Sequence, residues 1–381
     1  MFTNSEWALL LETARPNPDP QRLVDLAAQP LDWSRLLALA EQHGLLPILA
    51  IRLKNVPQGL FPPEICSQLQ EKNRSHTLFA LSLTRELFRL PDRFATANVE
   101  TALIKGPVLS MRCYGDPALR QYTDLDLIVR TRDMQLSTQL MLELGYEPRI
   151  PPQAIANGKI PGEYVFRRPN TNLLVEFHTE HTFRYYPRRL PLEKAFARKT
   201  WVAIDHHQVP ALSIEDELIL ICIHAAKHTW ERLAWVADVA ALISNNPSLN
   251  WQSATSAAAE VGAERMLRVG IWLAANVLEL PLAQQVAGYV NSDSTAVKLA
   301  KEIAGRLAEG RSAAPGIVRR AAFRAKMRGG FLPGLSYLLR LSLSPTEDDW
   351  SPEPGSSRPW LLDALSRPFR LARKYHRGVE E

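Results

Sequence analysis

Apolar residues recur at helical spacing through the first quarter of the chain. Between residues 7 and 53 leucines and alanines lie three to four positions apart, and the turns are punctuated by Pro16, Pro18, Pro20 and Pro30. A longer periodic segment begins at Pro62-Pro63-Glu64 and continues to about Phe94. Because proline followed by an acid is typical of a helix N-terminus, this segment is expected to be one long helix. The pattern predicts an all-helical region over residues 1–95.

After residue 95 the pattern changes to short apolar runs separated by turns. Four of these runs are expected to be strands, at residues 100–104, 125–129, 163–168 and 173–178. Helical patterns follow the first two strands, over residues 108–114 and 134–144, and Gly145 ends the second. We therefore expect residues 96–205 to form a small core around a mixed sheet.

Helical spacing returns after Ile214. The expected helices cover residues 215–244, 251–262, 264–278 and 294–307. The apolar stretch 331–343 contains Arg340 and is shorter than the roughly 20 residues needed to cross a bilayer, so it is expected to be a core helix. A C-terminal helical domain over 206–345 is then followed by a linker and a basic helix over 346–381. The predicted fold class is α+β, a mixed-sheet core flanked by N-terminal helices and a C-terminal helical bundle.

The composition agrees with a folded protein of two or three domains. The 381 residues are 46% hydrophobic and 22% charged, which is typical of globular proteins. The three cysteines form no metal-binding or disulfide pattern, and the N-terminus lacks the basic start and apolar core of a secretion signal. These features predict a cytoplasmic protein. The net charge of +5 favours anionic partners such as nucleotides, nucleic acid or acidic lipid.

Two aspartates lie two positions apart at the start of the second expected strand. Residues two apart in a strand point to the same face, so Asp124 and Asp126 are expected to present their carboxylates side by side. Repulsion and lost hydration make this arrangement costly unless a cation offsets them, and Mg²⁺ bound through carboxylates and phosphates is a common solution. The alternative places Asp124 in the preceding turn and pairs Asp126 with an arginine such as Arg120.

Two neighbouring segments favour the metal site over this alternative. Lys105-Gly106 ends the first expected strand, where a cation and exposed backbone amides can hold phosphate. Glu176 and His178 lie on one face of the fourth expected strand. A cation, several acids and a phosphate-binding turn are thus expected in one unit of the fold.

With these residues the chain resembles the nucleotidyltransferase superfamily, which has a polymerase-beta-like fold, and within it the bacterial family of uncharacterised nucleotidyltransferases. The resemblance covers roughly residues 95–245. It rests on Leu103-Ile104-Lys105-Gly106-Pro107, Tyr114-Gly115-Asp116-Pro117, Arg120, Thr123-Asp124-Leu125-Asp126-Leu127-Ile128-Val129, Leu144-Gly145-Tyr146, Val175-Glu176-Phe177-His178, His224-Ala225-Ala226-Lys227-His228, Arg232-Leu233-Ala234-Trp235 and Asp238. The wider superfamily has a Gly-Ser or Gly-Gly turn before its aspartates, whereas Gly106 is followed by Pro107, which lacks a backbone donor.

The resemblance implies an enzyme that moves a nucleoside monophosphate from an NTP such as ATP to an acceptor hydroxyl and releases pyrophosphate. It implies Mg²⁺, or Mn²⁺, as the cofactor, and Asp124, Asp126 and Glu176 as the catalytic and metal-binding residues. The expected partners are the NTP and an acceptor whose class stays open. A small molecule, a sugar, a protein or peptide side chain and an RNA end can each offer the hydroxyl.

Six further residues are expected to contact the nucleotide: Lys105, Gly106, Arg120, His178, Lys227 and His228. Each has a structural alternative. Arg120 can pair with Asp116 or Asp124, and His178 can be a half-buried, hydrogen-bonded histidine. Lys105 can extend from a strand end into solvent, and Lys227 and His228 can lie on a solvated helix face. Glu163 and Glu180 are alternatives to Glu176 as the third carboxylate.

Two other functional classes are alternatives to the transferase. One is a catalytically silent nucleotide-binding or scaffold protein with the same fold. The other, a carboxylate-pair hydrolase, is disfavoured because such enzymes place their acids on opposite sides of a bond, roughly 5 Å or more apart. Basic stretches at 184–189, 319–328 and 367–377 are candidates for an anionic acceptor or lipid, and the last lies in a helix that can rest on a membrane surface. Peripheral membrane contact is therefore a minor alternative.

Overall fold

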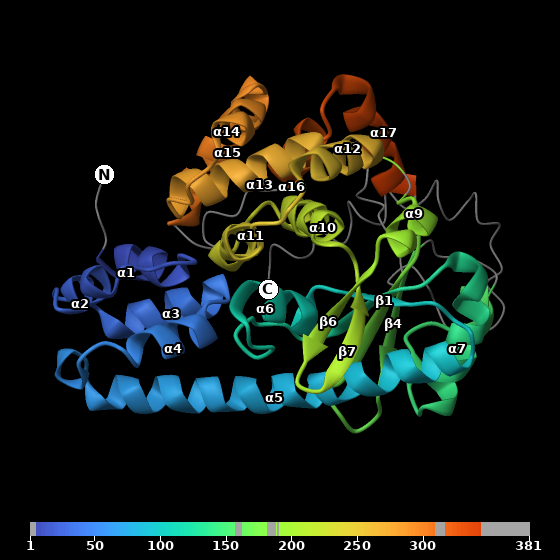
Figure 1. Ribbon diagram of the computed structural model, residues 1–381, viewed down its shortest axis with the longest axis horizontal. Coiled ribbons are helices and arrows are strands. Elements are labelled where there is room, and N and C mark those ends of the chain that lie inside the picture. The colour runs from blue at the N-terminus through green and yellow to red at the C-terminus, as the bar shows by residue number, and fades with distance from the viewer. Residues whose placement is uncertain (1–4, 157–161, 181–187, 189, 309–316, 344–381) are drawn as a thin grey trace.

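A mixed β-sheet forms the middle of the fold (Figure 1). The computed structural model describes residues 5–156, 162–180, 188, 190–308 and 317–343. Within these residues seven strands form one sheet in the order β3-β4-β5-β2-β1-β7-β6. The strands are β1 (Ala102–Ile104), β2 (Leu125–Ile128), β3 (Glu147–Pro148), β4 (Glu163–Arg167), β5 (Leu174–His178), β6 (Thr200–Ile204) and β7 (His207–Ala211).

Three of the expected strands pair at the centre of the sheet. β2 is antiparallel to β1 and parallel to β5, so Asp126 lies between Ile104 on one side and Glu176 on the other. β4, the remaining expected strand, is antiparallel to β5 and places Glu163 opposite His178. The four expected strands and the α+β class are confirmed.

The sheet also contains strands that the hydrophobic pattern does not predict. β3 has only two residues, and β6 and β7 form a hairpin through Asp205, whose φ is 52°. β7 runs parallel to β1, so the sheet extends past residue 205, the expected end of the core. The strand signal of the hairpin is weak because Pro210, which cannot donate a ladder hydrogen bond, lies within β7.

The two faces of the central strands have different partners. Leu103, Leu127 and Phe177 belong to a hydrophobic cluster with α5 (Pro63–Thr96) and α7 (Met134–Glu143). Ile104 and Ile128 belong to a second cluster, which includes α6 (Gly106–Tyr114) and α10 (Ile214–Lys227). Because side chains alternate along a strand, Asp126 and Glu176 lie on the face that is turned towards α10.

The described part of the N-terminal region is helical, as expected. Its short helices are α1 (Ser5–Ala14), α2 (Pro20–Ala27), α3 (Trp33–His43) and α4 (Leu46–Leu53), with a 3₁₀ turn, η1 (Gln58–Leu60), before α5. α5 confirms the predicted long helix and has 34 residues. Figure 1 shows it running beneath both the short helices and the sheet. It therefore ties the N-terminal helices to the core.

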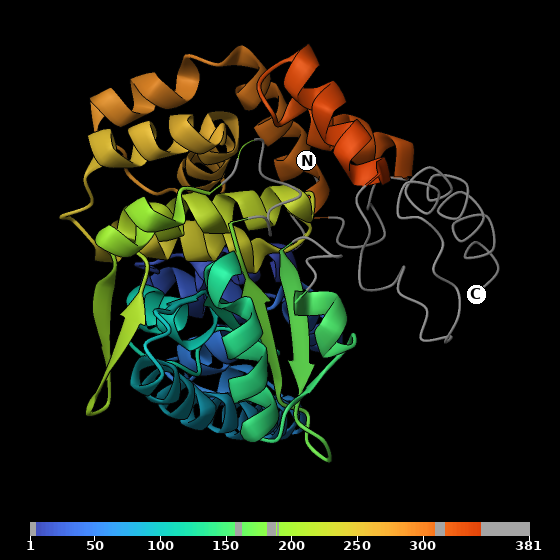
Figure 2. The ribbon, with the colours of Figure 1, turned by 90° about the vertical axis from the view of Figure 1, so that its right-hand side faces the viewer.

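A layer of helices covers the other side of the sheet. The helices after α10 are α11 (Leu233–Asn245), α12 (Trp251–Val261), α13 (Glu264–Val277), α14 (Gln284–Asn291), α15 (Ser294–Leu307), α16 (Ile317–Lys326) and α17 (Phe331–Leu343). Figure 2 shows the yellow-green α10 and α11 between the sheet and the orange helices. The remaining elements are η2 (Thr131–Asp133), α8 (Pro152–Ala156) and α9 (Leu192–Ala197).

The last described helix is less buried than the sequence predicts. α17 is helical as expected, and Tyr337 is buried, but Leu332 is 74% and Leu339 is 54% exposed. The prediction of a core helix is therefore wrong for this face. No helix among the described residues is long and apolar enough to span a bilayer. The basic stretch 319–328 lies on and just after α16, whereas residues 346–381 and most of 184–189 are outside the described residues.

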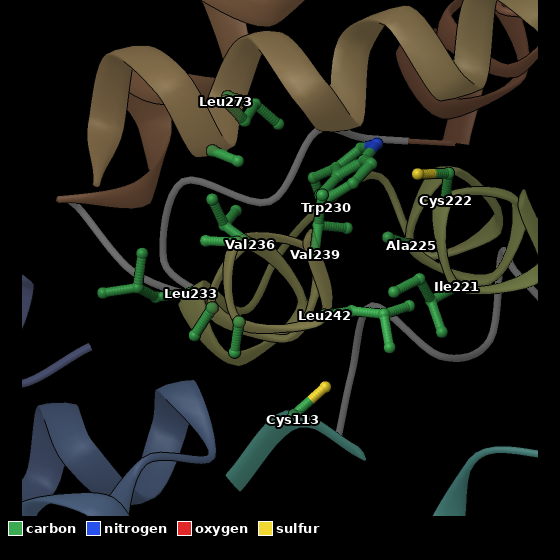
Figure 3. Close-up of a cluster of buried hydrophobic side chains, with 14 of the residues drawn as sticks. Cys113, Ile221, Cys222, Ala225, Trp230, Leu233, Val236, Val239, Leu242 and Leu273 are labelled. Atoms are coloured by element: carbon green, nitrogen blue, oxygen red, sulfur yellow. The ribbon is translucent and has the colours of Figure 1, made fainter. Parts of the chain in front are cut away.

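A buried tryptophan divides the expected helix over 215–244 into α10 and α11. Thr229 and Trp230 both have a φ of 55°, which is unfavourable for residues with a side chain and especially for a β-branched one. Trp230 is 1% exposed and lies near Cys222 and Leu273 (Figure 3). Burial of this large ring offsets the backbone strain. The turn is thereby fixed, and it sets the direction in which α11 leaves α10.

Candidate active site

A cleft of about 450 Å³ lies between the sheet and the helices α10 and α11. All of the predicted site residues except Gly106 line it: Asp124, Asp126, Glu176, Lys105, Arg120, His178, Lys227 and His228. The sequence distributes these residues over β2 with the loop before it, β5, the turn after β1 and the end of α10. The fold thus brings four separate segments to one cavity.

The floor of the cleft is a compact group of acids with a histidine. Possible ligand atoms of Asp126, Glu176 and His178 lie within 4.8 Å of one another. Asp126 Oδ1 is 2.5 Å from His178 Nε2 and 3.0 Å from Lys105 Nζ, and Glu176 Oε2 is 3.6 Å from the same histidine nitrogen. In-register pairing of β2 with β5 accounts for this proximity, because it sets Asp126 beside Glu176. Two carboxylates and an imidazole are a donor set that can hold a divalent cation.

Two of the three predicted metal-binding acids have raised pKa values. Burial, followed by the neighbouring Asp126, raises the pKa of Glu176 to about 7. The same two causes raise the pKa of Asp124. Burial would also raise the pKa of Asp126, but the Lys105 ammonium and the His178 hydrogen bond outweigh it and hold that pKa below its usual range. An added cation would offset the repulsion from Asp126 that, together with burial, raises the pKa values of Glu176 and Asp124.

Asp124 lies one residue before β2, as the structural alternative for this pair supposed. It is half-buried, lines the cleft and interacts electrostatically with Asp126. The partners of Asp126, however, are Lys105 and His178 and not Arg120. Asp124 therefore stays close to the other acids although it is outside the strand.

The turn after β1 aims Lys105 into the cleft but leaves Gly106 outside the lining. Lys105 and Gly106 both have positive φ, 54° and 44°. The conformation explains the glycine, since a Cβ at Gly106 would meet nothing closer than the Asp124 carbonyl at 3.7 Å. Gly106 is therefore required by the turn itself, and the cleft geometry gives it no contact with a ligand.

Arg120 has a different partner from those the sequence suggested. Its Nε donates to Asp238 Oδ2 on α11 over 2.8 Å, and both side chains are buried. Asp116 and Asp124 are not its ion-pair partners. Arg120 lines the cleft, but its charge is balanced from the helical side.

The alternative third carboxylates have other partners. Glu163 lines the cleft, and its Oε1 lies 3.4 Å from Lys227 Nζ. Glu180 is not part of the lining, and its Oε2 accepts a hydrogen bond from the Thr131 amide. Glu176 is thus the acid that lies beside Asp126.

Aromatic rings form the wall that faces the acids. The rings of His224 and His228 lie 4.8 Å apart, and each is 5.5 Å from the ring of Trp235. Burial, then Lys227, lowers the pKa of His228 to about 3, and burial, then Lys105, lowers the pKa of His224 well below its usual range. Both imidazoles are therefore neutral near pH 7. Sequence analysis did not single out Trp235 as a site residue, although it lies in a segment that carried the family resemblance.

One family of known proteins matches this chain over more than half of its length. A family model described as uncharacterised nucleotidyltransferase matches residues 29–279, well over half of the chain. Among solved structures, the chain is similar to an antigenic nucleotidyltransferase-like protein from Paracoccidioides brasiliensis, with 18% identity and a TM-score of 0.31, over 57% of this chain and 96% of that chain. No curated protein matches it. The family match contains the whole sheet and both walls of the cleft, and the chain belongs to the family of uncharacterised nucleotidyltransferases.

Proposed function

We propose that this chain is a metal-dependent nucleotidyltransferase that moves a nucleoside monophosphate from an NTP to an acceptor hydroxyl and releases pyrophosphate. The observation that carries the proposal is the group Asp126, Glu176 and His178 at the floor of a cleft that also contains Asp124 and two lysines. A purely structural role offers no reason to gather repelling acids in one place.

Three carboxylates of the cleft fit a hard divalent cation. Asp124, Asp126 and Glu176 would hold Mg²⁺ or Mn²⁺, which would offset the repulsion from Asp126 that, after burial, raises the pKa values of Asp124 and Glu176. His178, whose Nε2 lies 2.5 Å from Asp126 Oδ1, would orient that carboxylate. When bound, the cation would polarise the α-phosphate and stabilise the charge of the leaving pyrophosphate.

The other side chains of the cleft have roles that follow from their positions. Glu176, whose side chain is partly exposed, would accept the proton of the acceptor hydroxyl as its oxygen attacks the α-phosphorus. The bond from that phosphorus to the bridging oxygen breaks, and pyrophosphate leaves. Lys105 and Lys227 would bind the phosphates, and the neutral rings of His228 and Trp235 offer a flat surface for the base.

The test is incubation of the purified protein with each α-labelled NTP, Mg²⁺ and host cell extract. Labelled product is expected with wild type and not with the double variant Asp124→Asn/Asp126→Asn, while Glu180→Gln, outside the cleft, serves as control. Calorimetry should show metal-dependent nucleotide binding that the double variant loses. Equal binding by both proteins would overturn the metal assignment.

A catalytically silent nucleotide-binding protein is the second candidate. One observation favours it, namely that Asp126 already has an ion-pair partner in Lys105. This candidate predicts binding of the metal–nucleotide complex with no labelled product for any NTP. Product formation that depends on Glu176 would exclude it.

A further inference from the structure

Glu217 is a fully buried acid that lies behind the cleft. It is on α10, is 0% exposed and is not part of the cleft lining. Its Oε1 accepts a hydrogen bond from the Lys105 amide over 3.1 Å, and its Oε2 pairs with the Arg112 guanidinium. Arg112 is itself held by the Leu212 carbonyl at 2.8 Å and the Thr200 hydroxyl at 2.6 Å. A buried ion pair is weak evidence of a stabilising role, because apolar side chains of the same volume are often as stable.

The residue that Glu217 holds has a strained backbone. Lys105 has a φ of 54°, a conformation that is unfavourable for a residue with a side chain and persists only where surrounding contacts enforce it. The hydrogen bond to Glu217 on α10 is one of these contacts, since it fixes the position of the Lys105 amide. From this backbone position the Lys105 ammonium reaches Asp126 Oδ1 at 3.0 Å.

The Lys105 ammonium and a divalent cation compete for the same carboxylate. While the Lys105 ammonium is paired with Asp126, it repels a metal ion that arrives alone. A metal ion that arrives with a nucleotide brings phosphates, and the ammonium can pair with these instead. The position of Lys105 therefore decides how well the site discriminates a metal–nucleotide complex from the metal alone.

We propose that Glu217, held by Arg112, is a positioning residue that sets Lys105 so that the cleft prefers the metal–nucleotide complex over the free metal ion. The inference rests on the proposed function. Because Glu217 lies on the helix that also carries His224 and Lys227, it connects the position of the aromatic wall to the position of Lys105.

Glu217→Gln is the informative substitution. The two carboxylate oxygens accept from two different donors, and glutamine offers one acceptor and one donor, so it cannot satisfy both the Lys105 amide and Arg112. Glu215→Gln is the matched control, because Glu215 is in the same helical turn and accepts from the Asn250 amide instead. Lys105→Met gives the limit in which the ammonium is absent.

The expected signature is a change of opposite sign in two affinities. Glu217→Gln should bind Mn²⁺ alone more tightly and Mn²⁺ with α,β-methylene-ATP more weakly, each by about tenfold, the scale of one hydrogen bond to a charged group. Lys105→Met should change both in the same directions, and Glu215→Gln should change neither. Electron paramagnetic resonance measures free Mn²⁺, and calorimetry measures the analogue.

Other outcomes separate the inference from the proposed function. If Glu217→Gln weakens both affinities or changes neither, Glu217 is only a structural residue and the inference is overturned. If Glu217→Gln does not fold, Arg112→Lys is the substitute, because it keeps the charge pair and loses the forked guanidinium contacts. It is expected to change the two affinities in the same directions but by less. If wild type binds no Mn²⁺, the proposed metal-dependent function is overturned. Hydrogen exchange at the Lys105 amide, expected to be faster in Glu217→Gln than in Glu215→Gln, then still tests whether Glu217 holds the turn.

Discussion

Arg120 Nε donates to Asp238 Oδ2 over 2.8 Å and so connects the segment before β2 to α11. The other Asp238 oxygen accepts from the Tyr114 hydroxyl at 2.9 Å, so both carboxylate oxygens have partners. Since Arg120 and Asp238 are buried, neither charge can be compensated by solvent if its partner is removed. The chain that leads into Asp124 is thus held in place from the helical wall of the cleft.

Removing one member of this pair is expected to destabilise the protein strongly. Asp238→Ala leaves the Arg120 charge buried without its partner, which costs about 3–5 kcal/mol of unfolding free energy. The double variant Arg120→Met/Asp238→Leu should recover part of that loss, because it leaves no buried charge. Urea unfolding followed by circular dichroism measures both. Single and double variants of equal stability would show that the pair does not hold this segment.

The raised pKa of Glu176 predicts a pH dependence of metal binding. Because the pKa of Glu176 is raised to about 7, the group is protonated at lower pH, and a metal ion has to displace that proton. Mn²⁺ affinity should therefore rise by up to about tenfold per pH unit below pH 7 and level off above it. Glu176→Gln should flatten this profile and lower nucleotide transfer by roughly 10²-fold, the scale of a positioned acid-base group. An unchanged profile would exclude Glu176 as a metal ligand.

Local patterns were sufficient to predict much of the fold and of the site. Short apolar runs predicted β2 and β5, the two-residue period of a strand placed Glu176 and His178 on one face, and helical spacing predicted the long helix α5. The two strands belong to one sheet, which explains why Asp126, Glu176 and His178, which the sequence places in two separate short segments, lie close together in space.

Contacts that depend on tertiary packing could not be predicted in this way. Glu217 is in the first turn of α10, where an acid is ordinarily explained by the helix dipole and solvent, and nothing in its neighbours indicates a buried partner on α6. The turn at Thr229 and Trp230 contains no glycine or proline, so the helical spacing of apolar residues continues across it and predicts a single helix. In both places long-range contacts override the local preference.

The close packing around Trp230 predicts that Gly270 on α13 does not tolerate a side chain. A Cβ there would lie 2.5 Å from Cys222 Sγ and 3.0 Å from Trp230 Cη2, so Gly270→Ala is expected to destabilise the protein by about 1–3 kcal/mol. Gly305→Ala is the control, because it is an exposed helical glycine with no atom near its added Cβ and should gain roughly 0.5–1 kcal/mol from helix propensity. Thermal unfolding compares the two. A neutral Gly270→Ala would mean that Cys222 and Trp230 can move apart without loss.

Substitution of Lys227 tests whether α10 binds substrate or only packs against the sheet. Its Nζ lies 3.4 Å from Glu163 Oε1, and the two side chains are 26% and 31% exposed, so the pair contributes about 0–1 kcal/mol to stability. Lys227→Ala is therefore expected to leave the melting temperature nearly unchanged but to weaken binding of the metal–ATP complex by about tenfold through loss of one phosphate contact. Lys194→Ala, which removes an exposed ion pair with Glu260, is the control for the loss of one positive charge.

The same contact gives Glu163→Gln the opposite expected effect. In the structure Glu163 holds the lysine at β4, so a nucleotide phosphate has to displace it, and neutralising Glu163 removes the competitor without removing the cation. Metal–ATP affinity should then stay at the wild-type value or rise, whereas it falls in Lys227→Ala. Calorimetry of the two variants side by side measures the difference. If instead Lys227→Ala melts at a markedly lower temperature while its folded fraction binds metal–ATP normally, α10 supports the sheet only, and the nucleotide is bound by residues of the sheet and the turn at Lys105.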